Sequence, residues 1–214
     1  MSKMICIMGE SGAGKTTSMR ELNPKTTYYI DCDCKGLAWK GWKQQYNKEN
    51  KNYVATRDLA QIAQILVGVS EKRSDIKTIV IDTLNTCMVE HEVNEMAKGG
   101  FGKWIDLTQS VWGICKTASI LREDLTVIVV MHSERISDDF GYVFTRIKTN
   151  GRKLEKVVLE SLFGTVLLAK RTDEGKYVFE TQAKNSTAKT PMGAFETDEI
   201  DNNIVNVLKA LNEF

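Results

Sequence analysis

The segment Gly9–Thr16 constrains the fold more than any other part of the chain. It reads Gly-Glu-Ser-Gly-Ala-Gly-Lys-Thr and matches the pattern G-x-x-x-x-G-K-S/T at every fixed position. The apolar run Met4–Met8 before it predicts a buried strand, and Thr17–Leu22 after it predicts a helix that ends at Asn23 and Pro24. A strand, a glycine-rich loop and a helix in this order are typical of a phosphate-binding loop.

The residue types of this loop suit a nucleoside triphosphate. Glycines let the backbone curl so that successive N–H groups point at phosphate oxygens, and the helix N-terminus adds partial positive charge. We expect Lys15 to pair with the β- and γ-phosphates and the Thr16 hydroxyl to ligate Mg²⁺. The predicted nucleotide contacts are Gly9, Glu10, Ser11, Gly12, Ala13, Gly14, Lys15, Thr16 and Thr17. The expected ligand is ATP with Mg²⁺.

Strands and helices alternate through the first two thirds of the chain. Buried strands are predicted at Thr27–Ile30, Thr78–Ile81 and Leu125–Met131, and helices at Asp58–Val69 and Leu107–Leu121. This alternation predicts an α/β fold, with a mostly parallel central sheet flanked by helices. The C-terminal part is expected to add a β-hairpin and a terminal amphipathic helix, at Thr165–Lys170, Tyr177–Gln182 and Ile200–Phe214.

The composition is that of an ordinary globular domain. With 42% hydrophobic residues, the 214 residues suit a single domain over 1–214. No run approaches the roughly 18 apolar residues of a membrane span, and the N-terminus has no secretory pattern. We therefore expect a cytoplasmic protein with no membrane partner. A net charge of +1 leaves any nucleic-acid binding to local basic patches.

Three carboxylates follow predicted strands. Asp82 comes directly after Thr78–Ile81, at the sheet edge where α/β folds bind ligands, so it is expected to hold magnesium together with Thr16. No glutamate follows Asp82, and the carboxylate that orients an attacking water must come from elsewhere. Asp31 and Asp33 are available after the second strand and can point the same way, because alternate strand residues share a face. The alternative is a pair of solvated loop aspartates.

These residues together resemble the core of the RecA-type recombinase ATPases. In that family a catalytic carboxylate lies just after the second strand, and the matching position is Asp33, where the family has glutamate. The family's polar sensor, usually glutamine, matches His132, and Lys184 resembles a strand-end lysine that reaches a neighbour's nucleotide. The resemblance thus implies catalytic roles for Asp33, Lys15, His132 and Lys184. It also implies a homo-oligomer, either a ring or a filament.

The resemblance covers Met4–Phe195 and implies a RecA-like P-loop NTPase fold. The polymerisation helix and the additional C-terminal domain of full recombinases are not expected. A bare core of this size is similar to the short RecA-like single-strand annealing proteins of bacteriophages. That similarity implies a magnesium-dependent, DNA-stimulated ATPase that binds single-stranded DNA and promotes strand annealing or recombination, in the host cytoplasm if phage-encoded.

Two segments carry the mixture of cations and aromatic rings that a single-strand DNA site needs. The first is Met96–Trp104, with three glycines, two lysines, Phe101 and Trp104. The second follows His132 and contains Arg135, Tyr142, Phe144, Arg146, Lys148, Arg152, Lys153 and Lys156. The alternative for both is a solvated surface loop whose aromatic rings pack into the core.

A third basic segment, Lys35–Tyr53, contains Trp39 and Trp42. Either tryptophan could stack on the adenine, or both could lie in the core on an amphipathic helix. Two other function classes stay open at this point. A small P-loop kinase would transfer the γ-phosphate to a nucleoside or metabolite, although no clustered arginine lid is evident. A nucleotide-switch assembly ATPase would act on a protein partner instead of DNA.

Overall fold

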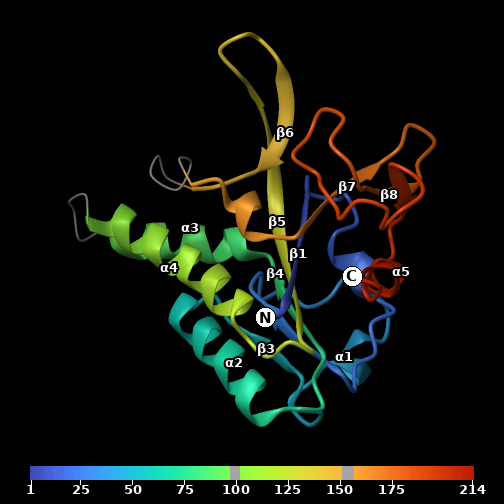
Figure 1. Cartoon of the computed structure of the whole chain (residues 1–214). Helices are drawn as coiled ribbons and strands as arrows, with labels where there is room; N and C mark the ends of the chain where they lie inside the picture. The colour runs from blue at the N-terminus through green and yellow to red at the C-terminus, as the bar shows by residue number, and fades with distance from the viewer. Residues whose placement is uncertain (97–101, 151–156) are drawn as a thin grey trace.

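A mixed β-sheet forms the centre of the computed structural model, which describes residues 1–96, 102–150 and 157–214 (Figure 1). Within these ranges the strand order is β3-β2-β4-β5-β1-β7-β8-β9, with β6 paired to the outer half of β5. The strands are β1 Lys3–Gly9, β2 Thr27–Asp31, β3 Tyr53–Ala55, β4 Thr78–Asp82, β5 Thr126–Ser137, β6 Val143–Ile147, β7 Thr165–Arg171, β8 Tyr177–Glu180 and β9 Glu199–Asp201. From β3 to β7 the neighbours are parallel, whereas β6, β8 and β9 pair antiparallel.

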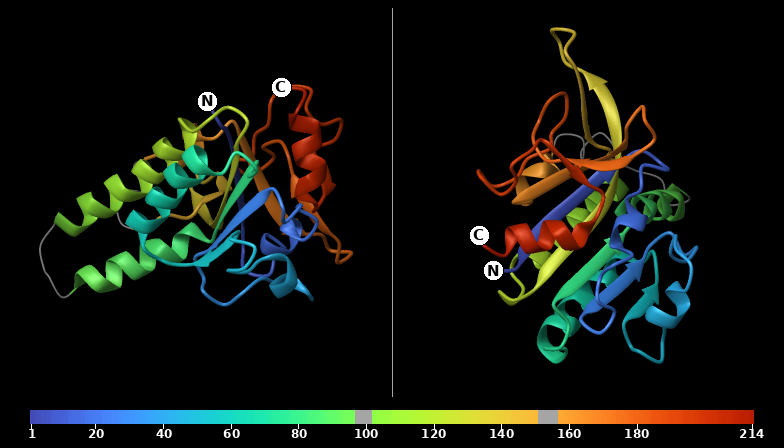
Figure 2. Two further views of the ribbon diagram at one scale, coloured as in Figure 1. Left: turned by 90° about the horizontal axis from the view of Figure 1, so that it is seen from below. Right: turned by 90° about the vertical axis from the view of Figure 1, so that its right-hand side faces the viewer.

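Helices cover both faces of this sheet. The longer ones, α2 to α4, lie together on one side, and α5 lies on the other (Figure 2). The helices are α1 Trp42–Gln45, α2 Leu59–Lys72, α3 Leu84–Met96, α4 Gly102–Ser119 and α5 Ile204–Leu211, with short 3-10 helices η1 Thr16–Met19 and η3 Leu159–Leu162. In the described ranges, no helix combines the length and the apolar character needed to cross a membrane.

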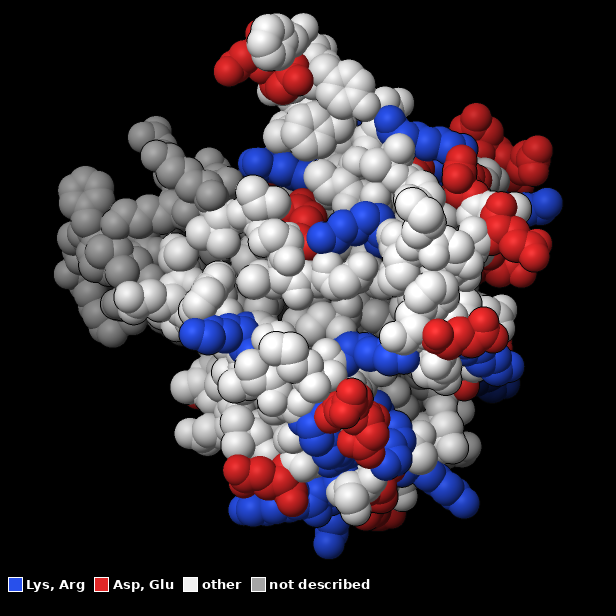
Figure 3. All heavy atoms as spheres, in the orientation of Figure 1, with Lys and Arg blue, Asp and Glu red and all other residues white. Residues whose placement is uncertain are grey.

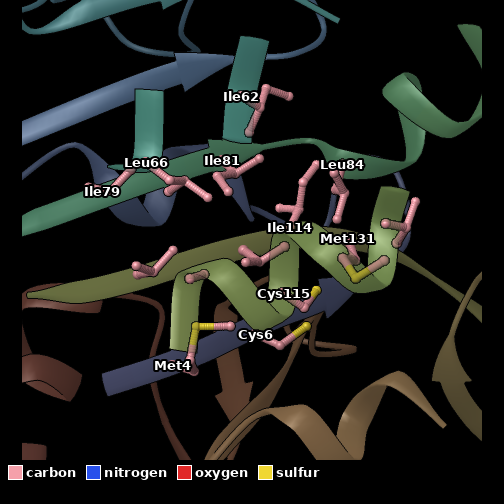
Figure 4. Packing of buried hydrophobic residues seen from close by; sticks show 14 of the residues in the cluster. Met4, Cys6, Ile62, Leu66, Ile79, Ile81, Leu84, Ile114, Cys115 and Met131 are labelled. Atoms are coloured by element: carbon pink, nitrogen blue, oxygen red, sulfur yellow. The ribbon is translucent and has the colours of Figure 1, made fainter. Parts of the chain in front are cut away.

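Two hydrophobic cores follow from the alternation of side chains along the buried strands. On β1, Met4, Cys6 and Met8 face the core under α2 and α4, while Ile5 and Ile7 face the core under α5. Figure 4 shows the first of these cores, where Ile114 and Cys115 of α4 pack against the sheet. Strands that are buried on both faces read as continuous apolar runs, which is why the sequence pattern located them.

The predicted α/β architecture agrees with this arrangement, including the antiparallel β7–β8 hairpin and the terminal helix. Several boundaries differ from the prediction. The helix expected at Thr17–Leu22 is only the 3-10 turn η1, and α5 starts at Ile204, where the Asn203 side chain accepts a hydrogen bond from the Val205 N–H. The segment after Asp82 forms α3, which the sequence analysis did not predict.

Parallel pairing brings the carboxyl ends of four strands to one edge of the sheet. Asp31 at the end of β2 is in register with Asp82 at the end of β4, and Gly9 at the end of β1 is in register with His132 on β5. Residues far apart in the sequence therefore meet at a single edge. The chain folds its phosphate-binding loop over the same edge.

Candidate nucleotide site

The phosphate-binding loop joins β1 to η1 and turns sharply at two glycines. Gly12 and Gly14 have φ angles of 80° and 88°, in the left-handed region that favours glycine. Lys15 is buried, and its Nζ donates hydrogen bonds to the carbonyl oxygens of Gly9 and Glu10, at 2.9 Å and 2.8 Å. Burial lowers the pKa of Lys15, while Asp82 and Asp33 act in the opposite direction. The lysine is thus curled back over its own loop.

A cavity of about 810 Å³ opens beside this loop. Its walls come from the loop itself, the segment after β2, the middle of β5 and the C-terminal segment around β9 and α5. The predicted residues that line it are Ser11, Gly12, Gly14, Lys15, Thr16, Thr17, Asp33 and His132. A volume of this size accommodates a nucleotide, since ligand pockets commonly span roughly 300–1,000 Å³.

Asp82 lies buried beneath the loop, at the end of β4. Its carboxylate accepts hydrogen bonds from the Tyr29 hydroxyl at 2.5 Å and the Thr83 hydroxyl at 2.9 Å, and the Thr16 hydroxyl is also within hydrogen-bonding reach. Burial raises the pKa of Asp82, and these hydrogen bonds counteract the rise. Hydroxyl and carboxylate oxygens are the ligands that Mg²⁺ prefers, so Thr16 and Asp82 fit the predicted metal. Among the described residues, no cluster of three or more His, Cys, Asp or Glu side chains could hold a metal.

The two aspartates after β2 have different environments. Asp31 is only 2% exposed, and its carboxylate accepts hydrogen bonds from the Cys34 N–H at 2.9 Å, the Gly36 N–H at 2.8 Å and the Tyr53 hydroxyl at 2.8 Å. Its oxygens hold the following turn together and do not line the cavity. Asp33 instead reaches the cavity and is not simply a solvated loop residue.

Asp33 is held by two side chains, Lys35 and Thr86. The Lys35 ammonium and the Thr86 hydroxyl each donate a hydrogen bond to its carboxylate. Burial alone would raise the pKa of Asp33, but these two hydrogen bonds outweigh it and keep the pKa below its usual value. Asp33 is therefore ionised at neutral pH and can accept a proton or orient a water molecule.

His132 follows the buried half of β5, and its ring lies within hydrogen-bonding reach of the Gly9 backbone. Burial and the nearby Lys15 lower the pKa of His132, so its imidazole is neutral at pH 7. Asn85, at the start of α3, fixes the backbone here. Its Oδ1 accepts a hydrogen bond from the His132 N–H at 2.7 Å, and its Nδ2 donates one to the Lys148 carbonyl at 2.8 Å.

Comparison with known proteins agrees with this geometry. Residues 1–191 match the family described as AAA domain. The chain belongs to the AAA domain family. The protein is therefore a nucleotide-binding domain of the P-loop ATPase class, and the predicted fold class is confirmed.

No curated protein sequence matches this AAA domain significantly. One similar solved structure is the KaiC-like protein PH0186 from the hyperthermophilic archaeon Pyrococcus horikoshii OT3. The match between the two structures has a TM-score of 0.48 and a sequence identity of 10%. It covers 83% of this chain and 76% of the other chain.

Lys184 of this AAA domain lies outside the nucleotide cavity of its own chain. Its ammonium is half exposed and forms long ion pairs with Asp198 at 3.7 Å and Glu199 at 4.0 Å. Among the four predicted catalytic residues, the structure thus brings together Lys15, Asp33 and His132 but leaves Lys184 apart.

The two tryptophans of the basic segment do not line the cavity of the AAA domain. Trp39 contacts Tyr29 and Tyr46 edge-on and donates a hydrogen bond from Nε1 to Gln45 at 2.7 Å, and Trp42 packs against Tyr53. Both are partly buried against the core under α5. Of the two interpretations offered by the sequence, packing against the core fits the structure, but the expected amphipathic helix is only the four-residue α1, and Trp39 precedes it.

The structure describes different parts of the two segments that were predicted to bind DNA. Residues 97–101 of the first segment and 151–156 of the second lie outside the described residues. The rest of the second segment forms the outer half of β5, a turn and β6, a hairpin that projects from the body of the molecule (Figure 1). Tyr142 and Phe144 stack on this hairpin with centroids 6.1 Å apart, and Phe140 at its tip is 96% exposed. The aromatic rings therefore do not pack into the core.

Sequence reasoning missed several residues of the site. Lys35 and Thr86 hold Asp33, and Tyr177 and Asn202 line the cavity. Thr86 and Asn202 become neighbours of the loop only through tertiary packing, so no local pattern marks them. The pair Asn202 and Asn203 just before an apolar helical stripe is a cap signal, which could have indicated the C-terminal wall.

Substitution of Asp31 should destabilise the fold much more than substitution of Asp33. Asp31→Ala removes the acceptor of three hydrogen bonds in a buried site and should lower the free energy of unfolding by about 3 kcal/mol. Asp33→Ala is the matched control and should lower it by less than about 1 kcal/mol, since its partners Lys35 and Thr86 can turn to water. Urea denaturation followed by circular dichroism measures both. Equal losses of stability would contradict the structural role of Asp31.

Proposed function

We propose that this protein is a magnesium-dependent ATPase that binds single-stranded DNA and promotes strand annealing or recombination. The continuity of β5 carries the proposal. The strand passes the nucleotide cavity at His132 and runs directly into a projecting hairpin with exposed aromatic and basic side chains. The strand β5 thus connects the nucleotide cavity to a surface suited to nucleic acid.

The nucleotide half of the proposal uses residues at the sheet edge. Lys15 and the loop N–H groups would bind the β- and γ-phosphates, and Thr16 with Asp82 would hold Mg²⁺. The metal, when bound, neutralises charge that develops on the phosphate oxygens. Asp33, ionised and close to Lys15, would orient the attacking water and take its proton. His132 would sense the terminal phosphate from the middle of β5.

Substitution of Asp33 and Lys15 separates binding from hydrolysis. Asp33→Asn keeps the shape of the side chain but not its basicity, so ATP should still bind while turnover falls by roughly 100-fold or more. Lys15→Ala should abolish binding itself, because it removes the cation aimed at the phosphates. Phosphate release measures the turnover, and titration with ATP measures the binding. Wild-type turnover in Asp33→Asn would remove this residue from the catalytic role.

The DNA half of the proposal depends on how charge is distributed along the hairpin. Acidic side chains lie at its tip and basic ones nearer its base (Figure 3). Arg146 is already paired with Glu134 at 2.9 Å, whereas Arg135 and Lys148 have exposed cations without an ion-pair partner among the described residues. DNA phosphates are therefore expected at the base of the hairpin, and the Tyr142–Phe144 stack, nearer the tip, offers a ring face to the bases.

The hairpin substitutions should have two different signatures. Arg135→Ala and Lys148→Ala should each flatten the log–log salt dependence of DNA binding by about 0.7, the contribution of one phosphate contact on a single strand. Tyr142→Ala should weaken binding by roughly 1–3 kcal/mol through lost stacking and leave the slope unchanged. Fluorescence anisotropy with a labelled oligonucleotide at several salt concentrations measures both effects.

Lys72→Ala provides the matched control, because this exposed lysine lies at the end of α2, away from the hairpin. It should change neither affinity nor slope. A purely cationic, nonspecific surface would respond to the charge substitutions but not to Tyr142→Ala. If no DNA binds with or without ATP, and a small-molecule acceptor stimulates turnover instead, the kinase alternative replaces this proposal.

We further propose that Lys184 acts on the nucleotide of a neighbouring copy in a ring or filament. Its exposure and its weak ion pairs leave it free to be redirected across an interface. It is also connected to the hairpin, since the Tyr142 hydroxyl donates a hydrogen bond to the Lys184 carbonyl at 3.1 Å. DNA that contacts the hairpin could therefore shift the segment that carries this lysine.

A mixing experiment addresses this arrangement. Lys184→Ala and Asp33→Asn proteins should each be inactive alone, yet a mixture should recover part of the ATPase activity, because some interfaces then contain both intact residues. Each variant mixed with itself is the control. A strictly monomeric protein under ATP, with no recovery in the mixture, would contradict the arrangement.

A further inference from the structure

The nucleotide cavity has a wall that the phosphate chemistry does not use. Lys15, Asp33 and His132 surround the region where the phosphates are expected. The cavity continues to residues of β8, β9 and the start of α5, namely Tyr177, Asp201, Asn202, Asn203 and Asn206. These residues share the cavity with the loop, so a triphosphate held there can direct its sugar and base toward them.

Asn202 is fixed in this wall with an unused side chain. It is 7% exposed, and its position is set by its backbone: its N–H donates a hydrogen bond to the Tyr177 carbonyl at 3.3 Å, and its carbonyl accepts one from Arg20 at 3.4 Å. Among the described residues, its buried Nδ2 has no hydrogen-bond partner. Native proteins leave few buried donors unsatisfied, and Asn202 lines the cavity, so this donor is available for a ligand there.

Tyr177 lies beside Asn202 and packs on the phosphate-binding loop. A Cβ added to Gly14 would lie 2.9 Å from its Cδ1 and 3.2 Å from Oδ1 of Asn202, so both side chains approach the loop backbone closely. The ring is half exposed, and the Arg171 guanidinium lies 5.8 Å from its centre. Aromatic rings in such positions provide a flat stacking surface for a nucleobase.

We propose that Tyr177 and Asn202 form the base subsite of this cavity and select purine nucleoside triphosphates. The inference rests on the proposed function, since it takes a triphosphate in the loop as given. A carboxamide offers one donor group and one acceptor, the pair that matches an edge of adenine. Stacking on Tyr177 favours the larger purine ring over a pyrimidine.

Competition binding tests the subsite against the phosphate loop. A fluorescent ATP analogue is displaced by ATP, GTP, CTP, UTP or inorganic tripolyphosphate, each with Mg²⁺. Tyr177→Ala should weaken ATP binding by about tenfold or more and Asn202→Ala by about fivefold, while tripolyphosphate binds as in the wild type. Tyr177→Phe keeps the ring and should keep ATP affinity. Asn212→Ala, at the exposed end of the same C-terminal segment, is the control and should change nothing.

The outcomes separate this inference from the proposed function. Equal affinity of the wild type for purine and pyrimidine triphosphates overturns the subsite, as does unchanged ATP affinity in Tyr177→Ala. A parallel loss of tripolyphosphate binding in the variants also overturns it, because the damage then lies in the loop. If Asn202→Ala melts far below the wild type, the comparison of Tyr177→Ala with Tyr177→Phe tests the base subsite instead. Wild-type protein that binds neither ATP nor tripolyphosphate contradicts the proposed function and the subsite together.

Discussion

Parallel pairing of β1, β2, β4 and β5 is the constraint on which the site depends. Each strand is buried on both faces, so its register is fixed by two cores at once, and a slip of one residue would exchange the side chains that pack in the two cores. The register places Gly9 beside His132 and Asp31 beside Asp82. Because strand ends carry these side chains, the sheet itself determines which groups surround the phosphate-binding loop.

Opposite charges share the buried floor of the cavity. Burial acts against the charged forms of Lys15 and Asp82, lowering one pKa and raising the other. The Asp82 carboxylate partly offsets the shift of Lys15, and hydrogen bonds from the Tyr29, Thr16 and Thr83 hydroxyls partly offset that of Asp82. Lys15 meanwhile bonds to the carbonyls of Gly9 and Glu10. A magnesium–triphosphate complex also carries charges of both signs, so the floor offers groups of opposite charge to each part of the ligand that we propose.

The sequence was informative where local pattern decides structure. The phosphate-binding loop, the apolar strands and the β7–β8 hairpin were predictable, because glycines, periodicity and turn residues act over a few positions. The outer half of β5 was not, because its polar residues are a strand only through pairing with β6. The roles of Asp31 and Asp33 could not be separated by alternation alone; the turn after β2 decides that Asp31 binds backbone N–H groups. Asn85 and Asn202 gain their partners from tertiary packing.

The side chain of Asn85 connects three segments: the start of α3, the middle of β5 and the residues after β6. It binds the backbone at His132 and Lys148, which are also bonded to each other through the Lys148 N–H and the His132 carbonyl at 2.8 Å. The foot of the hairpin is thus clamped to the helix that follows Asp82. From His132 to Ser137 the strand extends about 16 Å. Because His132 lines the nucleotide cavity, a tilt of about 10° of the hairpin about this residue would move its tip by roughly 3 Å.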